Sequence, residues 1–202
     1  MHAMYDIVCS VVIGGIVMVM LVGFNGNIVQ QAGTQTIRSM AQTNLTAVDD
    51  MLEYEFRKMG YGVAVPIDSA ILFADSNKIK FQGDLGNDGG MDTLTYFFNG
   101  SAASGQVNPS TRVLYRTMSP QPQQAINIGI TQLKFFYYDS AGVQLSRPVS
   151  MTSKIKAIRI SMNIESTADW IHRVKLSQRT ERYLTYNPGV SWERTFKPKN
   201  LR

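Results

Sequence analysis

The stretch Ile7 to Phe24, IVCSVVIGGIVMVMLVGF, decides how this chain is organised. These eighteen residues carry no charge, and a helix that spans a bilayer needs ~17–25 such residues. Gly14, Gly15 and Gly23 suit this setting, because glycine is more frequent in membrane helices and lets neighbouring helices approach closely. We therefore predict a retained membrane-spanning helix, with a cleaved secretory signal and a buried core helix as the alternatives.

The polar residues that follow continue the helical pattern in an amphipathic form. Apolar residues recur every three or four positions, which places them on one face of a helix: Ile37, Ala41, Leu45, Val48, Leu52, Phe56 and Met59. We divide this part into a transmembrane and assembly helix, 1–27, and an amphipathic second half, 28–62, that ends at Gly60 and Gly62. Gly26 and Gly33 predict a partly melted segment between the halves.

Beyond residue 62 the pattern changes to the two-residue alternation of β-strands. Six strands are predicted, at 78–82, 93–98, 112–116, 132–138, 155–164 and 171–179. In the fifth of these, Ile158, Ile160, Met162 and Ile164 share one face. The expected fold class is α+β, with a long N-terminal helix packed on an antiparallel β-sheet and residues 63–202 forming one β-rich globular domain.

Composition and charge offer little support for a catalytic or nucleic-acid-binding protein. The 202 residues carry a net charge of +5, with Lys and Arg spread along the chain. Their nearest approach to a cluster is the tail, at Arg194, Lys197, Lys199 and Arg202. We interpret this tail as a solvated segment, with attraction to acidic lipid or to an acidic partner as the alternative. Cys9 is the single cysteine, so no internal disulfide is expected.

The chain also lacks the usual signatures of an active site. It has two histidines, His2 and His172, and no phosphate loop, serine elbow or paired-carboxylate motif. The aromatic run from Phe135 to Tyr138 alternates along a strand, so it predicts two core and two surface side chains rather than a nucleic-acid platform. We expect a protein that is not an enzyme and does not bind nucleic acid.

One loop carries a candidate metal site. Asp84, Asn87, Asp88 and Asp92 lie close together among glycines, and calcium prefers several oxygen ligands of this kind. The order resembles the start of an EF-hand loop, but Gly86 stands at a ligand position and no Glu closes the loop. A polar turn that joins two strands is the first interpretation, and calcium binding is the second.

Taken together, these features resemble the type IV pilin-like superfamily, most closely its J-type minor pseudopilins and the related minor pilins. The resemblance rests on the long helix and on the segment MLEYEFRKMGYG at 51–62. It also rests on the hairpin at 79–98 with its Asp-Gly turn, and on the strands at 114–116 and 155–164. It does not extend to the family's processing signal, because no basic residue and no Gly precede Met4.

The resemblance implies a structural subunit of a type IV pilus or a type II secretion filament. Such a subunit is anchored in the bacterial inner membrane by a single pass, with its β domain in the periplasm or on an extracellular filament. Its partners are membrane lipid and other pilin or pseudopilin subunits, which it contacts through the N-terminal helix. In this family a carboxylate near the N-terminus meets the terminal amine of a neighbouring subunit, and Asp6 is the candidate here.

We therefore predict that three residues take part in assembly: Asp6, Gly14 and Gly15. The competing hypothesis is a single-pass, membrane-anchored extracytoplasmic binding domain or adhesin that does not polymerise. Substitutions at the three residues distinguish the two, because they affect function only in a chain that assembles.

Overall fold

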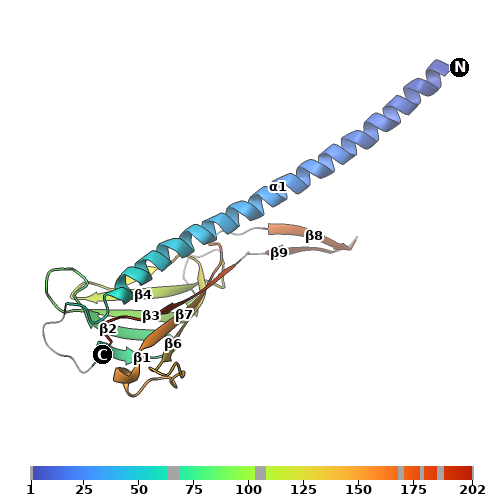
Figure 1. Ribbon diagram of the computed structural model, residues 1–202. Coiled ribbons are helices and arrows are strands. Elements are labelled where there is room, and N and C mark those ends of the chain that lie inside the picture. Colours follow the sequence, from blue (N-terminus) through green and yellow to red (C-terminus); the bar gives the residue numbers. More distant parts are fainter. Residues whose placement is uncertain are drawn as a thin grey trace.

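The computed structural model describes residues 2–62, 69–102, 108–167, 171–177, 180–185 and 189–201. One helix, α1 (His2–Arg57), precedes all the strands and projects far beyond them (Figure 1). The first five strands are β1 (Ile71–Ala74), β2 (Lys78–Gly83), β3 (Asp92–Ala102), β4 (Arg112–Ser119) and β5 (Gln124–Ile126). Then come β6 (Ile130–Tyr138), a 3-10 turn η1 (Thr152–Lys154), β7 (Ala157–Ile164), β8 (Ile171–Ser177), β9 (Thr180–Thr185) and β10 (Val190–Phe196).

Helix α1 is continuous over 56 residues, which at ~1.5 Å per residue corresponds to roughly 84 Å. The predicted melted segment near Gly26 and Gly33 is therefore wrong. An isolated glycine costs only ~1 kcal/mol relative to alanine, and an established helix propagates through it cooperatively. The helix ends at Arg57, earlier than the predicted 62, and Gly60 and Gly62 follow with φ of 70° and 71°. Left-handed glycines after the last turn confirm the predicted stop.

The strands form two main sheets and a separate hairpin rather than the single sheet that the sequence predicted. One sheet has the order β1-β2-β3-β4-β5 and the other β10-β7-β6, while β8 and β9 pair only with each other. Every pairing between the described strands is antiparallel. The α+β class is therefore confirmed and the single sheet is wrong, because alternation shows which residues face a core but not which strands pair.

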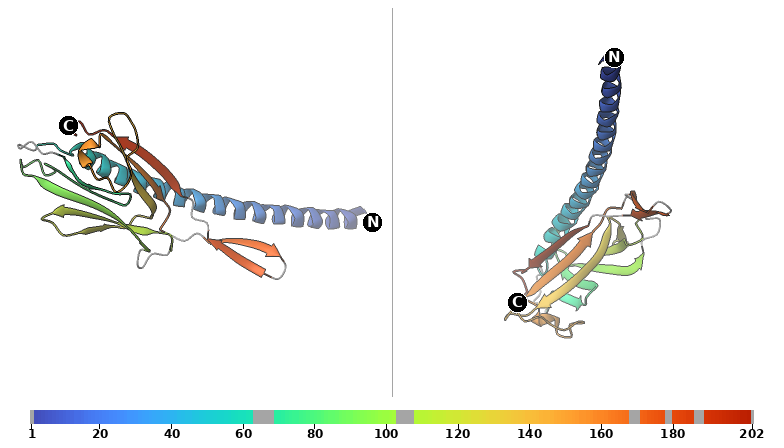
Figure 2. Two further views of the ribbon diagram at one scale, coloured as in Figure 1. Left: turned by 90° about the horizontal axis from the view of Figure 1, so that it is seen from below. Right: turned by 90° about the vertical axis from the view of Figure 1, so that its right-hand side faces the viewer.

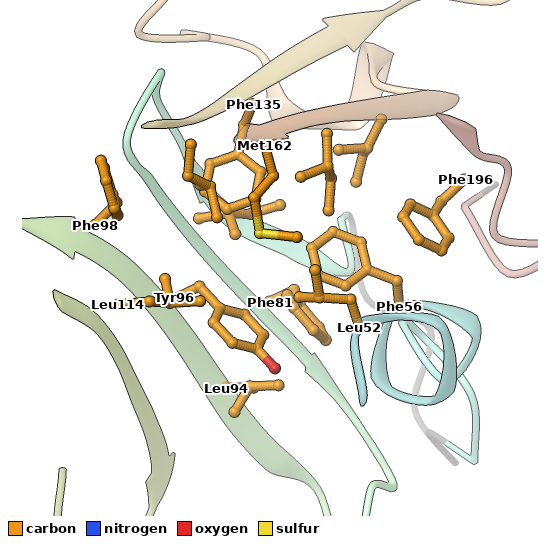
Figure 3. Packing of buried hydrophobic residues seen from close by; sticks show 14 of the residues in the cluster. Leu52, Phe56, Phe81, Leu94, Tyr96, Phe98, Leu114, Phe135, Met162 and Phe196 are labelled. Atoms are coloured by element: carbon orange, nitrogen blue, oxygen red, sulfur yellow. The ribbon is translucent and has the colours of Figure 1, made fainter. Parts of the chain in front are cut away.

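The two main sheets and the second half of α1 enclose one hydrophobic core. Phe56 lies where the three elements meet (Figure 3). Its ring centroid is 5.2 Å from that of Phe81 and 6.1 Å from that of Tyr96, both in the first sheet. It is also 5.2 Å from Phe196 and 6.4 Å from Phe135, both in the second sheet. A single helix residue thus joins both sheets.

The predicted apolar stripe of α1 is the face that enters this core. Ile37, Ala41, Val48, Leu52, Phe56 and Met59 are all buried, and Leu45 is half-buried. In β7, Ile158, Ile160, Met162 and Ile164 are buried as predicted from their shared face. Phe135 and Tyr137 are buried as well, while Phe136 is on the opposite side of β6, so the predicted split of that aromatic run is confirmed.

Candidate functional site

Among the described residues, the first half of α1 buries no side chain against the β domain and is the most exposed apolar surface. Its large apolar side chains, from Met4 to Phe24, range in exposure from 48% at Val17 to 76% at Met4. The helix is long and apolar enough to cross a membrane, and none of its apolar window is buried. A buried core helix, one of the sequence alternatives, is therefore excluded. Figure 2 shows this half projecting away from both main sheets.

The three predicted assembly residues all lie on this free half. Asp6 is exposed, and the hydroxyl of Ser10 donates a hydrogen bond to its backbone carbonyl one turn earlier. A Cβ added at Gly14 or Gly15 would meet nothing within 4 Å. The fold of the single chain therefore does not require glycine at either position, and their role in assembly stays a prediction.

The second half of α1 is held to the first sheet by a buried polar cluster of Glu55, Tyr96 and Arg116. Tyr96 (β3) and Arg116 (β4) are cross-strand partners, and both reach toward the helix. The Tyr96 hydroxyl donates to Glu55 Oε2, while Arg116 Nε and Nη2 donate to Glu55 Oε1 at 2.8 and 2.6 Å. The side chains of Arg116 and Glu55 are only 15% and 6% exposed. Because the pair is desolvated and fully bonded, it fixes the orientation of the helix on the sheet.

Burial and charge in this cluster set the protonation of its members. Burial, followed by the adjacent Glu55 carboxylate, raises the pKa of Tyr96 well above its usual 10.0. Burial opposes the charged form of Arg116, but its hydrogen bonds to Glu55 outweigh that effect and its pKa rises. Tyr96 is therefore a neutral donor and Arg116 a permanent cation at physiological pH.

A second polar contact holds α1 to the other main sheet. Arg194 of β10 places Nη1 2.7 Å from Asp49 Oδ1 and Nη2 2.6 Å from Glu53 Oε2. The hydrogen bond to Asp49 is the main reason that the pKa of Arg194 is raised. These side chains are partly exposed, so the contact adds orientation more than stability.

The loop of the predicted calcium site is a self-bonded turn tied to the end of the helix. Asp84 accepts bonds from the backbone N–H groups of Asp88 and Gly89, at 3.1 and 3.2 Å. Asp92 Oδ2 accepts from the N–H groups of Leu85 and Gly86, each at 3.0 Å.

The Lys58 ammonium bonds one of the four proposed calcium ligands, Asn87, and a backbone carbonyl of the loop. Its Nζ donates to the Leu85 carbonyl and to Asn87 Oδ1, both at 2.8 Å. No group of three or more His, Cys, Asp or Glu suited to a metal occurs in the described part of the chain. The geometry favours the polar-turn interpretation, and calcium binding stays an untested prediction.

Sequence reasoning missed the Glu55 cluster and the Arg194 contact. A signal for the first was available, since Glu55 falls three residues after Leu52 and four before Met59, on the apolar face of the helix. A charged residue on a buried face needs a partner. The partners could not be named, because Arg116 and Arg194 reach the helix only through strand pairing.

The chain matches no known protein-family profile, and no curated protein sequence is significantly similar to it.

Proposed function

We propose that this chain is a pilin-like structural subunit, a minor pilin or pseudopilin of a type IV pilus or type II secretion filament. The free half of α1 is its membrane anchor before assembly and its contact with other subunits afterwards. The β domain then lies in the periplasm or on the surface of an extracellular filament. The observation that carries the proposal is one unbroken helix, apolar and exposed in its first half and locked into a β domain in its second.

The physical argument concerns the exposed apolar surface. Contiguous apolar patches on soluble monomers rarely exceed a few hundred Å², so a helix half that is apolar on all sides needs lipid or other helices around it. The Glu55 cluster, the Arg194 contact and the aromatic junction at Phe56 hold the second half against both main sheets. A rigid connection of this kind suits a subunit that must keep its domain in a repeating position along a filament.

The test compares assembly with membrane insertion. Leucine at Gly14 and Gly15 and alanine at Asp6 are introduced into the full chain in the cell that produces it, with Val11→Leu as the matched control. We expect wild type and V11L to be recovered in the filaments that are sheared from the cell surface or the membrane. The three site variants should insert normally and be depleted from the filaments, because bulk at the glycines separates adjacent helices.

The second candidate, an anchored binding domain or adhesin, predicts a different result. In that case wild type stays in the membrane fraction as single copies, and the glycine and Asp6 variants behave like wild type. That outcome would favour the anchored domain over the filament subunit, because contact with lipid alone would then explain the exposed apolar surface of the first half of α1.

A further inference from the structure

A basic hollow lies on the outer side of the second main sheet, at the end of the domain furthest from the N-terminus. It is bordered by the turn after β6, residues 139–142, and by the side chains of Lys156, Arg159 and Lys197. Lys197 belongs to the basic tail. The fold places it next to Arg159 of β7 and next to Lys156, which directly precedes β7. Figures 1 and 2 show the C-terminus at the opposite end of the molecule from the N-terminus. Lys156, which lines the hollow, bonds the carbonyl of Leu201 near that end.

Arg159 is held in place before any ligand arrives. Its guanidinium carbon lies 4.8 Å from the ring centroid of Phe136 and 5.3 Å from that of Tyr138. Its Nη1 pairs with Glu193 Oε1 at 3.0 Å. Its Nε is buried and has no hydrogen-bond partner, which makes it the single orphaned buried side-chain polar atom among the described residues. The two rings and Glu193 therefore hold the guanidinium at the edge of the hollow.

The other charges around the hollow leave an excess of positive charge. Lys156 Nζ donates only to carbonyls, those of Ser153 at 3.2 Å and Leu201 at 3.3 Å. The carboxylate of Asp139 accepts from the N–H groups of Ala141 and Val143, at 2.9 and 2.8 Å, and stabilises the turn. No ion pair joins Lys156 or Lys197 to a carboxylate in the described part of the chain.

We propose that this hollow binds a carboxylate-bearing segment of a partner protein. The complementary ligand is an acidic segment whose carboxylates lie among Lys156, Lys197 and the guanidinium of Arg159, and arginine is the cation best suited to such recognition. The hollow adds a binding function to the domain whether or not the chain polymerises.

Its position argues against lipid headgroups as the occupant. The end of β10 lies level with Phe56, since the rings of Phe56 and Phe196 are 5.2 Å apart. Phe56 is 32 residues beyond Phe24, where the apolar run ends, which is roughly 48 Å of helix. An anchored subunit therefore holds the hollow several Debye lengths from its own membrane.

The proposal is tested with the full chain in detergent micelles and a fluorescent hexaglutamate peptide, followed by fluorescence anisotropy. Hexaglutamine is the uncharged control peptide. The variants are Lys156→Gln, Lys197→Gln and the double variant, with Lys80→Gln on the other main sheet as the matched control. We expect each site variant to weaken hexaglutamate binding about fivefold and the pair about 25-fold, with K80Q unchanged. Binding should also weaken as salt is raised.

Three results would overturn the proposal. The first is hexaglutamate binding that is absent in wild type or equal in wild type and the double variant. The second is inorganic phosphate that displaces the fluorescent peptide as well as unlabelled hexaglutamate does. That result would make the hollow a small-anion site. The third is binding to phosphatidylglycerol vesicles that requires Lys156 and Lys197 when binding to hexaglutamate does not. That result would make lipid the occupant of the hollow. Melting temperatures of all variants show whether the domain remains folded.

Discussion

The two halves of α1 are parts of one helix, yet they bury their apolar residues in opposite ways. Phe24 in the first half is 66% exposed, whereas Phe56 in the second half is fully buried. Among the described residues, the first half is apolar on every side and buries no side chain in the domain. The second half is apolar on one face, which packs in the core, and polar on the other, which is largely exposed. The difference teaches that the domain core holds only the second half of this helix, while the first half is long and apolar enough to cross a membrane.

The largest expected effect compares the two phenylalanines directly. Phe56→Ala removes the ring that contacts both sheets, so we expect the free energy of unfolding to fall by about 3–5 kcal/mol. Phe24→Ala should leave it unchanged, because that ring touches nothing in the domain. Urea unfolding of the full chain in detergent, followed by tryptophan fluorescence, measures both. Equal effects would mean that the two halves are not independent.

The buried carboxylate of the second half gives the next effect. Glu55→Ala leaves Arg116 buried without its counter-ion, so we expect a loss of about 3 kcal/mol. Asp50→Ala, on the exposed side of the same helix, should change stability by less than about 0.5 kcal/mol. In the Glu55→Ala/Arg116→Ala double variant the loss should be smaller than the sum of the single losses. Additive losses would show that the cluster is not coupled.

The raised pKa of Tyr96 predicts a dependence on alkaline pH. The neutral hydroxyl is favoured in the folded state, so its contribution is fully present below the usual pKa of 10.0. It is lost as pH rises from there toward the raised value, by up to about 1.4 kcal/mol per pH unit.

This contribution can be isolated with two tyrosine variants. Tyr96→Phe should remove its share of the slope, and Tyr137→Phe should remove a further share because burial also raises the pKa of Tyr137. Unfolding free energies between about pH 9 and 11 measure the slopes. An unchanged slope in Y96F would contradict the assignment.

A smaller effect is expected at the second polar contact. Arg194→Ala should lower the free energy of unfolding by less than about 1 kcal/mol, because its ion pairs with Asp49 and Glu53 are partly exposed and screened by salt. The difference from wild type should shrink at high ionic strength. A salt-independent loss of several kcal/mol would show that this contact contributes as much to stability as the Glu55 cluster does.

The smallest effect concerns the loop at 84–92. Because Lys58 bonds Asn87 and the carboxylates of Asp84 and Asp92 accept backbone N–H groups of the loop, we expect about 1 mM calcium to leave the melting temperature of the full chain unchanged. A bound ion at saturating concentration would raise it by mass action. A rise in wild type that disappears in Asp88→Asn would restore calcium binding as the function of this loop.

Most elements, but few of their partners, could be predicted from the sequence. The apolar stripe of α1, the buried face of β7 and the pairing of β2 with β3 agree with the predictions. The strands β1, β5, β9 and β10 were not predicted, because short strands and mixed polar runs such as Val190–Phe196 have weak local patterns. The split into two sheets, the Glu55 cluster and the basic hollow all depend on strand order.

The sequence by itself determined the long helix, its division into an apolar and an amphipathic half, and the β-rich character of the remainder. These are properties of periodicity and hydrophobicity, which act over neighbouring residues. The tertiary structure alone decided that Phe56 joins two sheets, that Arg116 neutralises Glu55, and that Lys197 lies beside Lys156 and Arg159. The members of each set are far apart in the chain, and only the packing of the helix and sheets around a shared core brings them together.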